Sequence, residues 1–261
     1  MSFISDFKSA PLSLYGVTGG ITSVETYLSS LVGVKFTADD DRVFALVQNG
    51  AVALVSARLV QSPATIGANH TGLTLSTASI GALTISATLG ATAVTANQYA
   101  GGILVISAGT GIGQTVKIAS HPAAALSTTV VLTLEDPLSV ATLTADSKGS
   151  LTLPQFGSSN GVSVVTSGVI VNPTTATGRT IGVTLYPIPA STTTIPTYGF
   201  IQTEGPVAVL NDGGTAIGLD VMPSSSVAGA VVTYVVATRN RIGTSTVAGE
   251  TTKAQLITLQ L

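Results

Sequence analysis

The sequence predicts a mainly β fold, built from β-sandwich or small-barrel subdomains with one short N-terminal helix. The 261 residues include 39 Thr and 27 Ser against ten basic and twelve acidic residues. Thr and Val favour strands because branching at Cβ suits a pleated surface. Apolar and hydroxyl residues alternate over many short segments, as they do in strands with one buried face. Turn-forming residues separate these segments at the spacing of a sandwich or small barrel.

Charge is scarce along the whole chain. Charged residues make up 8% of it, the formal net charge is −2, and residues 59–116 contain no acidic or basic side chain. The ten basic residues are scattered, so nucleic-acid binding is not expected. Acid–base, metal and phosphate chemistry need charges held in a site. The composition therefore favours a structural role, with much of the surface covered by copies of the chain or by a partner.

Several other classes of protein are not expected. The chain has no Cys, which excludes disulfides and thiolate metal sites. Its first residues lack a basic segment followed by an apolar one, so no secretory signal is expected. No apolar run reaches the roughly 18 residues of a membrane helix. We therefore expect a protein made in a cytoplasm or carried in a particle, with no cofactor, no metal site and no membrane partner.

The first residues are expected to form an extended arm. Residues 1–20 space three aromatic residues through Ser, Pro and Gly: Phe3, Phe7 and Tyr15. Aromatic side chains on such an arm can anchor it on a neighbouring subunit, so these three are the candidate contact residues. A frayed terminus is the alternative.

Residues 22–33 carry the one convincing helical pattern. Glu25 can reach back to a cap at Thr22, as in a capping box. An apolar stripe with spacing i, i+3, i+4 and i+7 is formed by Val24, Tyr27, Leu28 and Leu31. Gly33 can take the left-handed conformation that ends a helix. The stripe is expected to pack against a sheet.

Two local signals follow the helix. The three aspartates at 39–41 could bind a cation, but EF-hand spacing and its closing Glu are missing, so a solvated turn is predicted. Residues 42–48 and 51–60 are joined by Asn49-Gly50, which accepts the positive φ angles of a type I′ turn. They predict a hairpin.

The rest of the chain repeats a strand–turn rhythm. Residues 61–98 alternate apolar and hydroxyl side chains, and short strands continue from residue 101 to the last residues. We divide the chain into an N-terminal arm, helix and hairpin (1–60), a β domain (61–155) and a C-terminal β domain (156–261).

Three motifs suggest chemistry, and each lacks the context that the chemistry needs. The Gly-rich segment 109–113 would need a helix after it to cradle phosphate, and a strand-like segment follows, so a hairpin turn is predicted. The G-x-S-x-G match at 157–161 would need a strand before and a helix after it. His70 and His121 are expected in polar loops, without the carboxylates of a metal site.

A carbohydrate-active enzyme is one alternative. Glycoside hydrolysis needs two carboxylates a few ångströms apart. Glu204 and Asp212 flank one predicted hairpin, PVAVL, and are the first candidates, followed by Glu135, Asp136 and Asp220. The chain has no Trp on which a sugar ring could stack, which counts against this alternative.

Four short patterns carry a resemblance to a known class of proteins. They are Gly101-Gly102, Gly111-Ile112-Gly113-Gln114, Asp136-Pro137-Leu138 and Phe200-Ile201-Gln202-Thr203-Glu204-Gly205-Pro206. Over about residues 95–235, the chain resembles virion structural proteins of tailed phages. It is more similar to capsid-decorating or cement proteins than to major capsid proteins, because no long spine helix or charged scaffold segment is visible.

The resemblance implies a non-enzymatic decoration protein that binds and stabilises a phage capsid. Such a protein would be assembled in the host cytoplasm and located on the capsid surface of the virion. Its partners would be the major capsid protein and copies of itself, as a trimer, with the N-terminal aromatic residues docking on capsomers. The alternative is a receptor-binding fibre or adhesin head, which would bind through loops such as 61–71 or 191–199.

Overall fold

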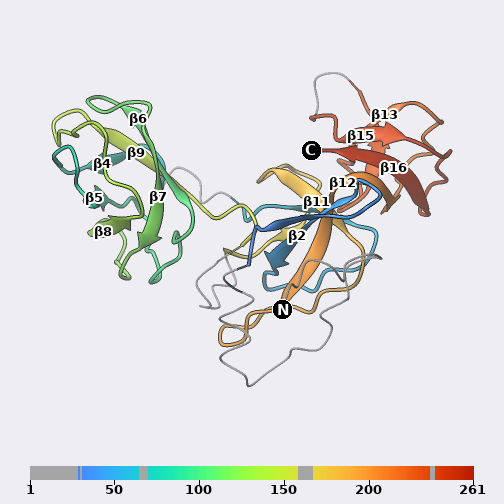
Figure 1. Ribbon diagram of the computed structural model, residues 1–261, viewed down its shortest axis with the longest axis horizontal. Helices are drawn as coiled ribbons and strands as arrows, with labels where there is room; N and C mark the ends of the chain where they lie inside the picture. The colour runs from blue at the N-terminus through green and yellow to red at the C-terminus, as the bar shows by residue number, and fades with distance from the viewer. Residues whose placement is uncertain (1–28, 30, 65–69, 158–166, 236–238) are drawn as a thin grey trace.

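The fold is almost entirely β, as predicted. A computed structural model describes residues 29, 31–64, 70–157, 167–235 and 239–261. The strands of these residues form two sheets, one of which closes into a small barrel. Figure 1 shows the barrel, made of β4 to β9, standing apart from a larger sheet made of the other strands.

The barrel has six antiparallel strands in the order β4-β5-β8-β7-β6-β9, and β9 closes it by pairing with both β4 and β6. They are β4 (Leu73–Leu75), β5 (Thr84–Thr88), β6 (Ile103–Ala108), β7 (Thr115–Ser120), β8 (Thr129–Leu134) and β9 (Lys148–Thr152). Successive side chains of a strand point alternately into the barrel and out of it. Along β8, Val130, Leu132 and Leu134 are buried and the residues between them are exposed. The buried aliphatic residues form one core.

The Gly-rich segment 109–113 is a turn, as predicted. It connects β6 to β7, which pair as a hairpin. Gly109, Gly111 and Gly113 have φ angles of 75°, 86° and 92°, a region in which a side chain is strained. The segment therefore makes a tight connection between strands and leads into no helix.

The second sheet has ten strands. They are β1 (Lys35–Thr37), β2 (Val43–Gln48), β3 (Leu59–Gln61), β10 (Ile170–Val171), β11 (Thr180–Thr184), β12 (Tyr198–Leu210), β13 (Asp220–Pro223), β14 (Val231–Thr233), β15 (Gly243–Ser245) and β16 (Ala254–Gln260). The first part of β12 pairs with β2 and its second part with β16. The register shifts between Gln202 and Glu204, and Gly205 follows with a φ of 88°. This bulge lets one strand serve two separate apolar cores.

The barrel is an insertion in the second sheet. The chain leaves the sheet after β3 and returns at β10. These two strands pair with each other, with Ile170 opposite Gln61 and Val171 opposite Val60. The connections to the barrel therefore start from neighbouring strands. Strands from the predicted ranges 1–60 and 156–261 share this sheet, and all barrel strands fall within 61–155.

The predicted hairpin of residues 42–48 and 51–60 is wrong. Strand β2 pairs with β1 and β12, and β3 pairs with β10 and β11. Asn49-Gly50 is not a hairpin turn between them. Asn49 is fully buried, and its Nδ2 donates to the carbonyl oxygens of Ile188 at 3.2 Å and Pro189 at 2.7 Å. Tertiary hydrogen bonds thus override the local turn preference of Asn-Gly.

Most of the predicted N-terminal features lie outside the described residues. This holds for the helical pattern up to residue 28 and for the three candidate contact residues, Phe3, Phe7 and Tyr15. Gly33 has the predicted left-handed conformation, with a φ of 84°. The aspartates at 39–41 form the predicted exposed turn, in which Asp40 Oδ2 lies 2.7 Å from Arg42 Nε.

Candidate functional site

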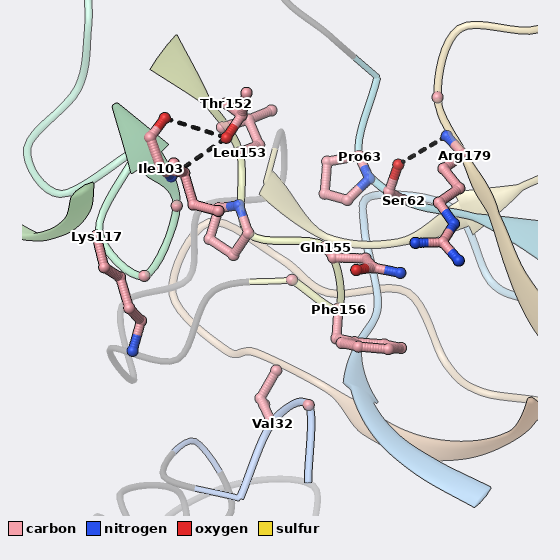
Figure 2. A pocket seen from close by; sticks show the side chains of 16 residues that line it. Val32, Ser62, Pro63, Ile103, Lys117, Thr152, Leu153, Gln155, Phe156 and Arg179 are labelled. Atoms are coloured by element: carbon pink, nitrogen blue, oxygen red, sulfur yellow. Dashed lines mark hydrogen bonds between the residues drawn. The ribbon is translucent and has the colours of Figure 1, made fainter. Parts of the chain in front are cut away.

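A cleft of about 700 Å³ lies where the barrel meets the sheet (Figure 2). Gly102, Lys117 and Thr152 line it from the barrel, and Ser62 and Arg179 line it from the sheet. The segment leading out of the barrel after β9 also lines it. The volume is within the range of small-molecule sites.

Two cationic side chains stand on opposite sides of this cleft. Figure 2 shows Lys117, from β7, on one side and Arg179, from the residue before β11, on the other. Lys117 Nζ forms an ion pair with Glu135 Oε1 at 3.0 Å, and both side chains are about half exposed. Within the described part of the chain, Arg179 forms no ion pair. Arg179 is therefore the one cationic side chain without an acidic partner among the described residues that line the cleft.

The hydroxyl groups of Ser62 and Thr152, which line the cleft, form hydrogen bonds with main-chain groups. Ser62 Oγ accepts a hydrogen bond from the Arg179 N–H at 3.0 Å. Thr152 Oγ1 accepts from the Ile103 N–H at 3.2 Å and donates to the Ile103 carbonyl at 3.1 Å. No Asp, Glu or His is among the described residues that line the cleft. Its geometry offers neither an activated nucleophile nor a general base.

The two histidines are buried, which corrects the expectation of polar loops. His70 and His121 are 0% and 3% exposed and lie on either side of Tyr99 in the barrel. His70 Nε2 lies 2.9 Å from the carbonyl oxygen of Thr92, and its Nδ1 lies 2.5 Å from the Tyr99 hydroxyl. Because a carbonyl oxygen only accepts, Nε2 carries the proton and Nδ1 accepts from Tyr99.

The same reasoning makes His121 neutral. Its Nε2 accepts from the Tyr99 N–H at 3.0 Å, and its Nδ1 donates to the Pro122 carbonyl at 2.9 Å. Burial lowers the pKa of His121, and the nearby His70 lowers it further, against the opposing effect of the Pro122 hydrogen bond. Burial also raises the pKa of the Tyr99 phenol. The three side chains form a buried, hydrogen-bonded network that supports the barrel, without an exposed base.

The first candidate pair of catalytic carboxylates is not brought together. Glu204 and Asp212 do not flank a hairpin, because residues 198–210 form the single strand β12. At about 3.3 Å per residue, the stretch of β12 from Glu204 to its end at Leu210 spans roughly 20 Å, and Asp212 follows it, which is well beyond the spacing that glycosidases need. Glu204 pairs instead with Lys35 at 3.2 Å, and Asp212 accepts from the Ser224 hydroxyl at 2.5 Å.

The outer surface of β5 and β8 is a second candidate site, which we call the β5–β8 face. Its cross-strand pairs are Thr84 with Thr133, Ser86 with Val131, and Thr88 with Thr129. No charged residue occurs in either strand. Ile80 and Leu83 precede β5 and are 69% and 51% exposed, and Val131 is 45% exposed. Strand β5 lies within the charge-free stretch 59–116, whereas β8 lies after it.

No protein-family model matches the chain, and no curated protein or solved structure matches it significantly. Among the described residues, no group of three or more His, Cys, Asp or Glu could hold a metal ion. No helix of that part is long and apolar enough to cross a membrane.

Proposed function

We propose that this chain is a non-enzymatic virion structural protein that binds and stabilises a phage capsid, in the manner of a decoration protein. The observation that carries the proposal is the β5–β8 face. Surfaces buried in protein–protein interfaces are depleted of charge at their centre, and exposed aliphatic groups beside such a surface mark an interaction site. The sequence resemblance to tailed-phage virion proteins supports the same assignment.

The arrangement of the two sheets suits a protein that attaches to a shell. The barrel is closed, so its strands leave no free edge for uncontrolled pairing. The second sheet curls around its own cores and carries the barrel on two neighbouring strands, β3 and β10. An uncharged face on a barrel held in this way can meet a repeated surface of capsid protein. Copies of the chain, as a trimer, complete the proposed assembly.

Introducing a charge at the centre of the β5–β8 face tests this function. Val131→Lys is expected to reduce binding to shells of the major capsid protein at least about tenfold, since a buried unpaired lysine costs more than 1.4 kcal/mol. Its side chain points outward, so the fold should be retained. Co-sedimentation of the full chain with assembled shells measures the effect, and analytical ultracentrifugation measures self-association.

Ser107→Lys is the matched control. Ser107 is an exposed residue of β6, on another wall of the barrel, and the substitution adds the same charge. It should leave shell binding unchanged. Equal losses in the two variants, or a wild-type chain that is monomeric and indifferent to shells, would contradict the proposed function.

A receptor-binding or adhesin head is the second candidate, favoured by the cationic cleft. The proposed receptor loop 191–199 is firmly anchored: Ser191 Oγ donates to the Asn49 carbonyl at 2.6 Å, and only residues 192–195 are exposed. Binding to host-cell glycans without affinity for shells would favour this candidate. Substituting Lys117 or Arg179 would then reduce glycan binding, whereas Val131→Lys would not.

A further inference from the structure

Three of the five arginines of the chain gather around one further pocket. This pocket, of about 460 Å³, is lined by Arg179, Arg239 and Arg241, together with Asn172 and Thr180. Asn172 directly follows β10, Arg179 and Thr180 lie at the start of β11, and Arg239 and Arg241 lie in the connection between β14 and β15. In a chain with 8% charged residues, such a concentration of one sign is not expected from composition. Because like charges repel, binding of a negatively charged group would stabilise this cluster of arginines.

The described residues provide only part of that negative charge. Asp220 Oδ1 lies 3.2 Å from Arg241 Nε and balances one arginine. Arg239 donates to the main-chain carbonyls of Pro173 and Thr174, which hold its side chain without neutralising it. Arg179 forms no ion pair within the described part of the chain. The pocket thus keeps a surplus of positive charge.

A buried amide adds a donor that has only a weak partner. Asn172 lines the pocket and is 3% exposed. Its Oδ1 accepts from the Thr180 hydroxyl at 2.9 Å, which fixes the orientation of the amide. Its Nδ2 reaches only the Pro173 carbonyl, at 3.4 Å, a long contact for a hydrogen bond. A buried donor with so poor a partner suits an incoming acceptor.

We propose that this pocket binds a small molecule through an oxyanion group, either a carboxylate or a phosphate. Guanidinium groups bind both with paired hydrogen bonds, and the surrounding arginine, amide and hydroxyl groups supply donors for the oxyanion oxygens. The volume fits a small ligand, and apolar residues such as Pro223 and Ile242 line the pocket beside the polar side chains. This binding activity goes beyond the proposed attachment to capsids, which does not require it.

Isothermal titration of the full chain tests the proposal with two probes, inorganic phosphate and glucuronate. Saturable binding of at least one probe is expected, and the tighter one assigns the group as a phosphate or as the carboxylate of an acidic sugar. Arg179→Gln should weaken that binding about tenfold, the effect of losing one charge-assisted hydrogen bond. Arg42→Gln removes the same charge from the exposed turn at 39–41, outside the pocket, and should leave binding unchanged.

A second variant is expected to bind more tightly, so that misfolding cannot imitate the result. Asp220→Asn removes the one acidic partner while an amide oxygen can still accept from the Thr244 hydroxyl, which lies 3.2 Å from Asp220 Oδ1. It should strengthen binding several-fold. The proposal is overturned if neither probe binds saturably, if Arg42→Gln weakens binding as much as Arg179→Gln, or if Asp220→Asn leaves the affinity unchanged.

Discussion

Gly102→Ala is expected to unfold the barrel under conditions in which the wild-type chain is stable. A Cβ at this position would lie 2.0 Å from the Thr152 carbonyl oxygen and 2.9 Å from that of Tyr99. Both are main-chain atoms, so no flexible side chain can move aside. Relief requires β6 and β9, which pair from Ile103 and Thr152 onwards, to separate. We expect a loss of about 4 kcal/mol or more in the free energy of unfolding.

Gly113→Ala is the matched control for this loss. Gly113 lies in the turn between β6 and β7, has a φ of 92°, and has open space where its Cβ would be. Its substitution carries only backbone strain, about 1–2 kcal/mol. Calorimetry gives the unfolding midpoints, and hydrogen exchange of β6 and β9 amides shows whether the loss lies in the barrel. Equal destabilisation by the two substitutions would show that the close approach at Gly102 is unimportant.

The barrel was the most predictable part of the fold, because its strands are specified locally. Buried aliphatic residues alternate with exposed or partly exposed ones within β5, β7 and β8, and the buried side of that alternation becomes the core. The turn at 109–113 is similarly local, since its glycines permit the positive φ angles that the hairpin needs. The sequence-based division at residue 61 also precedes every barrel strand.

The features that the sequence did not predict depend on contacts between distant segments. Asn49 and Gly50 have the local pattern of a turn, but the Asn49 side chain donates hydrogen bonds to the carbonyl oxygens of Ile188 and Pro189, which lie far along the chain. Residues 198–210 form the single strand β12 in place of the predicted hairpin at PVAVL, because a bulge at Gly205 accommodates the Gly-Pro pair within the strand. No single-sequence pattern reports which strands will be neighbours.

The β5–β8 face and the cationic pocket also differ in how far they could be predicted from the sequence. The uncharged β5–β8 face could be anticipated from composition, because a segment without charge has no charged surface to present. The cationic pocket could not, because Arg179 is separated from Arg239 and Arg241 by four intervening strands and meets them only through the curl of the sheet. Isolated basic residues in a sequence therefore give little information on whether they act together.

Mild acid is expected to destabilise the barrel through His121. Its pKa is lowered in the folded state by burial, so the unfolded chain binds a proton more readily. Stability is then fully present above the unfolded pKa of about 6.5 and is lost as the pH falls towards the lower, folded pKa. Nε2 of His121 now accepts a hydrogen bond from the Tyr99 N–H. Protonation would put a hydrogen on Nε2, so that two N–H groups would face each other. The barrel should therefore unfold before the second sheet, which contains neither histidine.

His121→Gln separates this effect from general acid denaturation. A glutamine oxygen can accept from the Tyr99 N–H, but the side chain does not titrate. We expect a lower unfolding midpoint at neutral pH, because the Pro122 hydrogen bond is weakened, and a smaller decrease between about pH 7 and pH 5.5 than in the wild type. Hydrogen exchange of barrel amides at both pH values measures the difference. If the variant loses protection as steeply as the wild type, protonation of His121 does not cause the acid sensitivity.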